Sequence, residues 1–340
     1  MPLISDLVGL GYGQNVLWPS LFLVAGLVVV VETCRKVYTS RSLPPSPPKH
    51  WLWGNKGLLG KPYRHILIGT EYKQKLGDII STVTPTKTSI FLNTMEMATE
   101  LLDKHASVTS DRPRDIMTTE LLGWGTSAAF RNHDELHKKM RRVLASALHP
   151  TAARSYASQH LDTALGLIYE VARNPSSFMK CTDAAIGTFT VRLAFGYSPK
   201  TQQDPILRLA HDATRYATTS LGQHWLVNDF PLLKYIPSWF PGAEFRRIAE
   251  RGHAVRMRYA DTLFNIVLEQ VRKGNVEQPS YVSGLLESKG GVNANHSDTY
   301  IIKWTGASIF SAGATTVGYI MCHIPLVMLI HSAFLDRKPD

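Results

Sequence analysis

The 340-residue sequence has little cysteine, and its three cysteines, Cys34, Cys181 and Cys322, lie far apart. So sparse and odd a set is neither a disulfide framework nor a zinc site, because both need several cysteines at short, regular spacings. It favours a reducing compartment for the bulk of the chain. Internal repeats and basic runs with interleaved aromatics are also missing, so nucleic-acid binding is not expected.

Acidic residues are scarce as well. Asp and Glu number 27 against 37 Lys and Arg, which gives a formal charge of +10 with histidine neutral. Such an excess suits an anionic membrane surface or an acidic protein partner. With 44% hydrophobic and 19% charged residues, the composition can fill a folded core and is not that of a disordered chain.

Charge is absent from Val16 to Val31, where the run VLWPSLFLVAGLVVVV predicts a transmembrane helix together with the uncharged residues before it. Arg35, Lys36 and Arg41 follow this run, while only Asp6 precedes it. Because basic flanks stay cytoplasmic, the N-terminus is expected in the lumen and the body in the cytosol. A buried N-terminal helix is the alternative.

Four prolines stand between Pro44 and Pro48. They favour a stiff extended segment, although a disordered linker fits the composition equally well. The expected organisation is therefore a membrane anchor over 1–36, a proline-rich hinge over 37–55 and a body over 56–340.

The body is expected to be mainly helical with a small β-sheet, an α+β fold. β-Branched and aromatic residues predict a hairpin over 79–84 and 88–92. Apolar spacing predicts helices over 95–105, 134–148, 161–173, 184–195, 205–221, 243–273 and 300–330. The stretch 274–296 is interpreted as a polar loop. The apolar, proline-punctuated connector 231–242 is expected to dip into a membrane surface or to pack internally.

The predicted helix 134–148 is strongly basic. His137 and Arg141 lie four residues apart and so share one face. That face can hold an anionic group with two donors, and a solvated charged face is the alternative.

The predicted helix 300–330 is interrupted by Ser311-Ala312-Gly313-Ala314-Thr315-Thr316. Glycine inside a helix costs about 1 kcal/mol relative to alanine, which indicates close approach of a ligand or of another backbone. Small residues followed by hydroxyls make a notch with a proton donor at its edge. The alternatives are a packed helix crossing and a second membrane span over Trp304–Ile330.

Several segments, taken in order, resemble the cytochrome P-450 (haem-thiolate) monooxygenases of the fungal microsomal type. The proline hinge is similar to that family's membrane hinge, and Ser311–Thr316 resembles the oxygen-binding notch of its long central helix. The other matching segments are Trp53-Gly54-Asn55, Gly77-Asp78-Ile79, Ser110-Asp111-Arg112-Pro113, Lys138–Arg142, Lys234–Pro237 and Trp239–Gly242. The resemblance covers residues 1–331.

The resemblance implies a haem cofactor and assigns roles to particular residues. Thr315, with Thr316 beside it, matches the catalytic hydroxyl that helps protons reach bound oxygen, while Ala312 and Gly313 line the notch. His137 and Arg141 match the positions that hold a haem propionate. Segments 118–125 and 221–227 would line the substrate.

The implied function is hydroxylation or epoxidation of a lipophilic secondary metabolite. The reaction would use O2 and electrons from NADPH, delivered by an NADPH-cytochrome reductase. The implied location is the endoplasmic reticulum membrane, with a single span and the body in the cytosol.

The sequence departs from the family pattern in three ways. Ala314 stands where an acid normally precedes the threonine, and His137 stands where an aromatic residue is expected. The family's Glu-x-x-Arg helix and cysteine loop do not occur in these residues, so no metal ligand is assigned. The fold is therefore expected to lack its C-terminal haem-ligand part, and the chain to be inactive as given. A non-catalytic membrane-anchored remnant or interaction protein without haem is the alternative.

Apolar faces carrying Ile320, Leu326, Met328 and Leu329 are expected to be exposed and to promote aggregation.

Overall fold

The structure, a computed structural model, describes residues 42–201 and 204–335. The predicted membrane anchor lies outside these residues, and the proposed boundaries of anchor, hinge and body stay predictions. The described chain divides after Thr109 into two compact units, an N-terminal unit and a helical unit that begins at Ser110. In the described part no helix is long and apolar enough to cross a membrane. The suggestion of a second span over Trp304–Ile330 stays a prediction, because part of that stretch lies outside the residues that are described in full.

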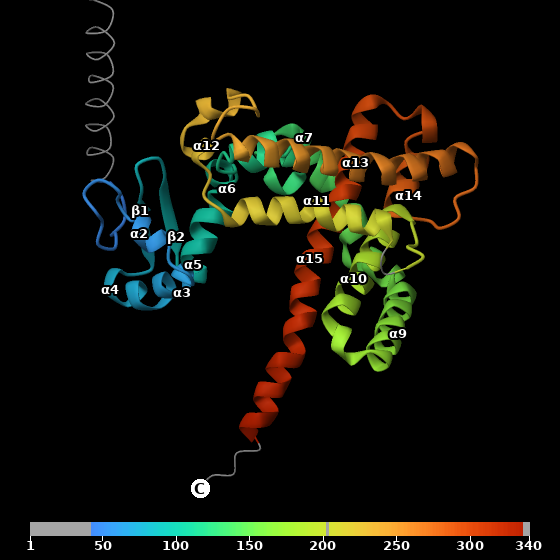
Figure 1. Cartoon of the computed structure of the whole chain (residues 1–340), viewed down its shortest axis with the longest axis horizontal. Coiled ribbons are helices and arrows are strands. Elements are labelled where there is room, and N and C mark those ends of the chain that lie inside the picture. Colours follow the sequence, from blue (N-terminus) through green and yellow to red (C-terminus); the bar gives the residue numbers. More distant parts are fainter. Residues whose placement is uncertain (1–41, 202–203, 336–340) are drawn as a thin grey trace, which may run out of the picture. The chain divides into compact units, whose positions relative to one another are not determined.

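The N-terminal unit contains a two-stranded antiparallel hairpin surrounded by short helices (Figure 1). Strands β1 (Ile79–Val83) and β2 (Thr88–Leu92) confirm the predicted hairpin. The apolar positions of the hairpin pack on the helices through a small core of Leu58, Ile68 and Ile80. The helices are α2 (Lys56–Leu59), α3 (Arg64–Leu67), η1 (Ile68–Tyr72), α4 (Lys73–Leu76), α5 (Met95–Ala98), η2 (Thr99–Lys104) and α6 (Ala106–Thr109). The predicted helix 95–105 is thus formed by α5 and the π-helical η2.

The proline-rich segment is docked on this hairpin. Ser81 donates its backbone N–H to the Pro45 carbonyl at 2.8 Å and its hydroxyl to the Pro44 carbonyl at 2.7 Å. Asn55 donates to the Pro47 carbonyl at 3.0 Å and accepts from the Val83 N–H at 2.8 Å. Proline carbonyls remain good acceptors although the ring removes the N–H. Interpretation of this stretch as a disordered linker was therefore wrong.

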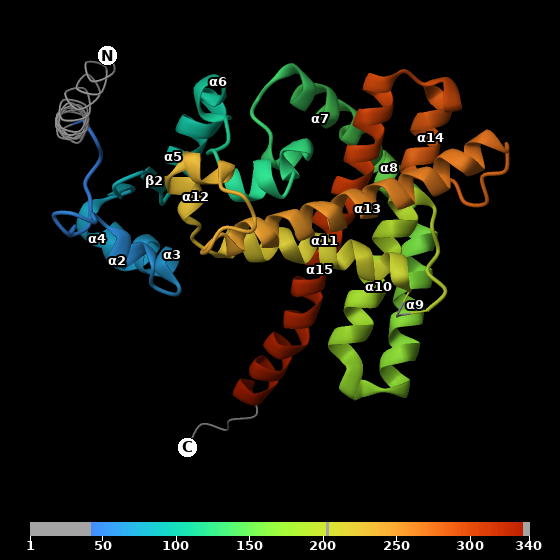
Figure 2. The ribbon, with the colours of Figure 1, turned by 45° about the horizontal axis from the view of Figure 1, so that its top comes forward.

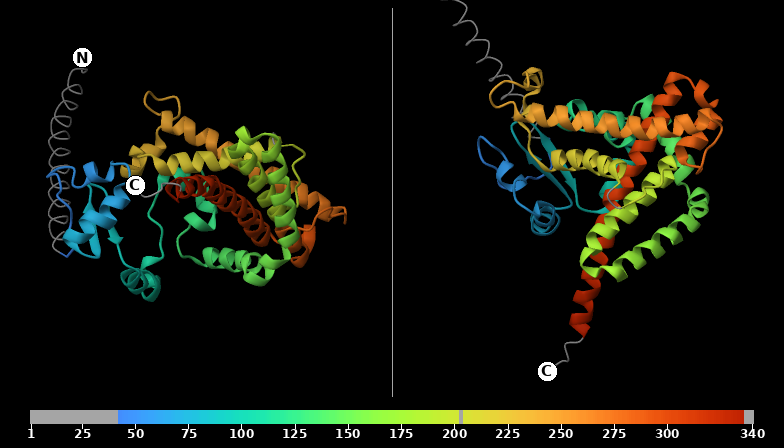
Figure 3. Two further views of the ribbon diagram at one scale, coloured as in Figure 1. Left: turned by 90° about the horizontal axis from the view of Figure 1, so that it is seen from below. Right: turned by 45° about the vertical axis from the view of Figure 1, so that its right-hand side comes forward.

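The helical unit is arranged around α15 (His296–Leu335), which confirms the long helix predicted from residue 300 and runs through Pro325. The other long helices of the unit are α9 (Ala157–Arg173), α10 (Phe178–Phe195), α11 (Pro205–Gly222) and α13 (Glu244–Arg272), of which α10, α11 and α13 contact α15. Helices α11 and α13 lie side by side (Figure 2), and α9 pairs with α10 (Figure 3). The remaining elements are η3 (Ile116–Leu121), η4 (Trp124–Thr126), η5 (Ala128–Phe130), α7 (Glu135–Leu148), α8 (Pro150–Ser155), η6 (Pro175–Ser177), α12 (Leu226–Asp229), η7 (Pro231–Tyr235), α14 (Tyr281–Ser288) and η8 (Gly291–Asn293).

Glycines let α10 and α14 approach α15 closely. A β-carbon at Gly306 would lie 2.6 Å from Val282 Cγ2 and 3.1 Å from Phe195 Cζ. The core around this approach is made of large side chains, since Phe195 and Phe310 are both buried. The glycine therefore serves packing here, and this packing fixes α15 in the unit.

Helix α14 lies where the sequence predicted a polar loop over 274–296. Ser280 caps it by accepting from the Ser283 N–H, and the Ser283 side chain accepts in return from the Ser280 N–H. Tyr281, Val282 and Leu286 are buried against the core. The loop prediction failed because glycines and asparagines flank a helix of only eight residues.

The C-terminal half of α15 extends past the other helices of its unit (Figures 1 and 2). Ile320 is 56% exposed and Met328 is 66% exposed, which agrees with the expected exposed apolar face. The side chains of Leu326 and Leu329 are not among those that the structure describes. Poor solubility stays a prediction, and its basis is this uncovered apolar surface.

His211 on α11 gives the helical unit a pH dependence that can be measured. Its ring packs edge-on to the ring of Phe310, with 5.5 Å between the ring centroids. Burial lowers the pKa of this imidazole, although the negative charges of Asp183 and Asp212 act in the opposite direction. Between the lowered folded pKa and the unfolded value near 6.5, the unfolded chain binds more protons, so stability falls as pH falls. We expect the thermal midpoint to drop between pH 7.5 and pH 5, and His211→Asn to shrink that drop. The matched change at exposed His296, His296→Asn, should leave the drop intact; equal slopes in both variants would contradict the assignment.

Candidate functional site

The surface of α15 changes at its small-residue turn. Side chains from Ile301 to Phe310 are mostly buried. In the next turn Ala312 and Thr316 are exposed, while Ala314 is only 4% exposed. The turn is therefore divided between a packed side and an open side.

Gly313 belongs to the packed side. A β-carbon there would lie 2.7 Å from Thr190 Cγ2 on α10. The helix-crossing interpretation of the small residues is therefore correct for Gly313, whereas Ala312 and Thr316 keep an open surface. The side chain of Thr315 lies outside the description, although its backbone continues α15. The predicted cofactor and catalytic roles of these residues stay predictions.

Helix α7 begins at a well-defined cap and confirms the predicted helix 134–148. The Asp134 carboxylate accepts the N–H of His137 at 2.7 Å, which satisfies one of the free donors of the first turn. Arg131 holds that carboxylate in place with a contact of 2.8 Å. The capping interaction thus fixes the start of the helix at the turn that carries His137.

His137 and Arg141 present two different nitrogen donors on α7. His137 is half-buried, and its Nδ1 has no hydrogen-bond partner among the described residues. Burial lowers the pKa of this imidazole, and the positive charge of Arg141 and the nearby His133 act in the same direction. The Arg141 side chain is exposed and forms no ion pair within the described ranges. A neutral imidazole beside a free guanidinium can bind a carboxylate through hydrogen bonds and charge.

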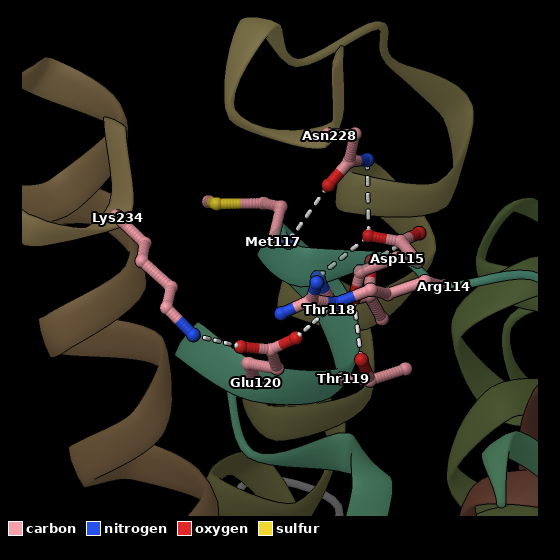
Figure 4. Close-up of polar contacts among 8 residues, drawn as sticks. All are labelled: Arg114, Asp115, Met117, Thr118, Thr119, Glu120, Asn228 and Lys234. Atoms are coloured by element: carbon pink, nitrogen blue, oxygen red, sulfur yellow. Dashed lines mark hydrogen bonds and ion pairs between the residues drawn. The ribbon is translucent and has the colours of Figure 1, made fainter. Parts of the chain in front are cut away.

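The π-helical turn η3 is tied to the connector after α11 by a polar network (Figure 4). Asp115 caps the turn by accepting the Thr118 N–H at 2.9 Å. Asn228 of α12 accepts the Met117 N–H at 2.9 Å and donates to Asp115 at 3.1 Å. One amide side chain therefore satisfies two groups of a turn that lies more than a hundred residues earlier in the chain.

An ion pair strengthens this connection. Glu120 lies between Arg114 at 2.7 Å and Lys234 at 2.8 Å. The hydrogen bond from Arg114 is the main cause that lowers the pKa of the Glu120 carboxyl, and Lys234 adds to it. The carboxylate is therefore charged at neutral pH and links η3 to η7.

The two segments predicted to line substrate lie close together. Thr118 and Ser220 share a hydrogen bond of 2.9 Å between their hydroxyls, and both residues are buried. Ser220 also borders a cavity of about 250 Å³, with Arg215, Tyr216, Thr219, Gln223, Trp225 and Ile248. This volume is below that of common ligand pockets. Leu122 and Trp124 also share a buried cluster with Val227, so the two segments are neighbours, while substrate binding there stays a prediction.

Sequence reasoning missed three side chains of this region. Asn228 and Glu120 were passed over because their partners are distant in sequence, although Asp115 three residues before Thr118 has the spacing of a cap. Arg256 was missed because it is one of many charged residues in the predicted helix 243–273, yet it is only 3% exposed. A single charged residue on the apolar face of α13 was the available signal.

The described residues do not supply an evident iron ligand. They contain no group of three or more His, Cys, Asp or Glu side chains arranged for a metal. Cys181 is buried in α10 within 3.2 Å of the Ser177 hydroxyl. Cys34 and the side chain of Cys322 lie outside the description. His137 and Arg141 have the donors that a haem propionate needs, and Ala312 and Thr316 leave one side of α15 open, but no iron ligand is identified among the described residues.

The family model for cytochrome P450 matches residues 44–331, a range that contains α7, the η3 network and α15 except for its last four residues. The chain belongs to the cytochrome P450 family. Among P450 relatives, cytochrome P450 monooxygenase ppsD of Aspergillus oryzae is 30% identical over 86% of this chain and 55% of its own length. Cytochrome P450 monooxygenase ARMGADRAFT_974139 of Armillaria gallica is 28% identical over 87% of this chain and 59% of its own. The chain therefore spans little more than half the length of these relatives.

A solved structure agrees with the P450 fold. A zebrafish cytochrome P450, solved with progesterone, superposes with a TM-score of 0.62 at 18% identity. The match covers 82% of this chain and 63% of the zebrafish chain. The mainly helical P450-like fold with its small sheet is thereby confirmed, and the family implies haem as cofactor.

Proposed function

We propose that this chain supplies the oxygen-side half of a haem monooxygenase centre, built on the open turn of α15. Exposure of Ala312 and Thr316 directly after a buried helical stretch is the observation that carries the proposal. Membership of the P450 family over 44–331 supports it. When bound, the haem supplies the oxidising chemistry, while the protein supplies the pocket, the proton path and the orientation.

The propionate groups of the haem are assigned to α7. Arg141 is an exposed cation without an ion-pair partner in the described ranges, and it provides charge and a forked donor for a carboxylate. His137 provides a neutral imidazole whose Nδ1 lacks a partner among the described residues. A propionate oxygen would complete the hydrogen bonding of that nitrogen.

Thr315 and Thr316 are assigned to hold protons near the oxygen substrate. A threonine Oγ1 can donate one hydrogen bond and accept two, so it can hold a proton and pass it on. Ala314 is buried and carries only a methyl group where the family has an acid. We therefore propose that proton delivery in this chain relies on the hydroxyls and on water, and is slower than with a carboxylate.

The proposed substrate is a lipophilic small molecule, a secondary metabolite that is hydroxylated or epoxidised with O2 and electrons from NADPH. Two fungal relatives named as monooxygenases support the reaction class. Exposed basic residues Lys138, Lys139 and Arg142 on α7 suit an acidic reductase. The competing function, an interaction protein without haem, is an outcome of the following test.

Haem binding by α7 variants tests the proposal. Ferric haem titrated into the purified full chain should bind more weakly to Arg141→Gln, by about 10-fold, because one charge-assisted bond of about 1.5 kcal/mol is lost. Arg142→Gln removes the same charge from the neighbouring exposed position and should change the affinity less than twofold. Equal losses in both variants would indicate nonspecific attraction, and an absence of saturable binding in the parent chain would favour the protein without haem.

Membrane association is proposed for the connector 231–242, in keeping with an endoplasmic reticulum location. Leu232 is 80% exposed and Trp239 is 78% exposed, and aromatic residues favour the membrane interface. We expect the double change Leu232→Ser and Trp239→Ser to lower cosedimentation of the chain with phosphatidylcholine–phosphatidylserine vesicles at least threefold. Leu165→Ser with Ile168→Ser alters two exposed apolar residues of α9 and serves as the control. The assignment fails if the control pair lowers binding as much as the connector pair.

A further inference from the structure

Arg256 is a buried cation without a buried anion. Its side chain is 3% exposed, and the described chain places no carboxylate in contact with it. Its Nε and Nη1 have no hydrogen-bond partner among the described residues. Burial lowers the pKa of this guanidinium to about 10, so it remains charged at neutral pH. Burying a charge in this way is unfavourable, and only specific contacts can offset it.

Two indoles provide those contacts. The Arg256 Cζ lies 4.2 Å from the ring centroid of Trp304 and 4.5 Å from that of Trp124. Its Nη2 donates to the Thr126 hydroxyl at 2.6 Å. Cation–π contacts gain strength when they are desolvated, and the planar guanidinium is the cation best suited to stack on a ring. Arg256 of α13 thus joins the η4 turn to α15.

The η4 turn also contacts the side of α15 that carries Ala312 one turn further on. Ser127, the residue after η4, shares a hydrogen bond of 3.0 Å with Ser308. Trp304, Ser308 and Ala312 follow one another at intervals of four residues, so they lie on successive turns of one side of α15. The first two contact Arg256 and Ser127, while the third remains exposed.

We infer that Arg256 is a positioning residue that holds the segment Gly123–Ser127 over the Trp304–Ser308 side of α15 and so sets the edge of the open surface at Ala312. In this role it limits which substrates reach Ala312, because a shift of the turn along α15 would cover or widen that surface. The importance of that surface rests on the proposed function. The positioning itself does not, since it concerns only contacts within the chain.

Hydrogen exchange on the full chain tests this role. The Ser127 N–H donates to the Trp124 carbonyl at 2.9 Å and reports on the turn. We expect Arg256→Met and Arg256→Lys each to speed exchange in 123–127 at least 10-fold, because neither side chain is a planar cation. The melting temperature of Arg256→Met should stay within about 3 °C of the parent, since replacing a buried charge by an apolar group of similar length is often neutral. Arg258→Met changes an exposed arginine of the same helix and should leave exchange unchanged.

Tryptophan emission adds a second readout, since Trp124 and Trp304 lose the cation between them in Arg256→Met. The inference is supported if exchange rises in 123–127 alone and the emission changes. It is overturned if exchange in the turn matches the parent in both variants, or if exchange rises equally along α13 and α15, which indicates a merely structural role. Neither haem nor substrate is needed, so failure of haem binding leaves this result interpretable.

Discussion

Gly306→Val is expected to destabilise the helical unit by about 1 to 3 kcal/mol, the usual cost of overfilling a packed core. The new β-carbon would meet Val282 at 2.6 Å and the ring of Phe195 at 3.1 Å. Both neighbours belong to the same core, and Val282 is fully buried, so neither can move without disturbing α10 or α14. The loss should appear as a fall of several degrees in the thermal midpoint, since a unit of this size shifts by about 2 to 4 °C per kcal/mol.

The matched control is Gly284→Val on α14. A β-carbon at Gly284 meets nothing within 4 Å, and the residue is exposed. Valine there should leave stability unchanged or raise it slightly, because glycine is among the poorest helix formers. If Gly306→Val matches this control, α10 and α14 do not depend on a glycine for their approach to α15.

Ala312→Trp is expected to abolish most haem binding while leaving the fold intact. Ala312 is exposed on the open side of α15, so an indole there has room in the free chain but would occupy the surface assigned to the porphyrin. We expect affinity for ferric haem to fall at least 10-fold, equivalent to about 1.4 kcal/mol. Titration followed in the Soret region measures it, and thermal unfolding checks the fold.

Ala164→Trp provides the control for an added indole. Ala164 is another exposed alanine, on α9, and its replacement should change haem affinity less than twofold. Should Ala164→Trp weaken binding as much as Ala312→Trp, the bound haem does not lie on the turn of α15.

Local patterns predicted the secondary structure well where periodicity extends over several turns. The hairpin, α7 and α13 were all anticipated, because alternation and 3.6-residue spacing follow directly from which face is buried. Helix α14 was missed because its two turns are too short to show a period. The docking of the proline segment was missed because it depends on Asn55 and Ser81, whose partners are not near them in sequence.

The candidate site was predicted only in part. The residues of the α15 turn were identified, but the sequence left open whether they serve packing or a ligand. The fold assigns Gly313 to α10 and leaves Ala312 exposed, because successive residues of a helix point in different directions. The stacking of Arg256 between two indoles brings together α13, η4 and α15. No local pattern encodes such a contact.

The most direct measurement is the absorption spectrum of the purified, unextended full chain titrated with ferric haem, then reduced under carbon monoxide. If α7 holds the propionate edge of the haem and the open turn of α15 covers one face of the porphyrin, binding should be saturable, with one haem bound per chain. Because these residues offer no thiolate loop, the reduced carbon monoxide complex should lack the red-shifted Soret band typical of thiolate ligation. A chain that takes up no haem, or one that shows the thiolate band and turns over substrate, would contradict this assignment.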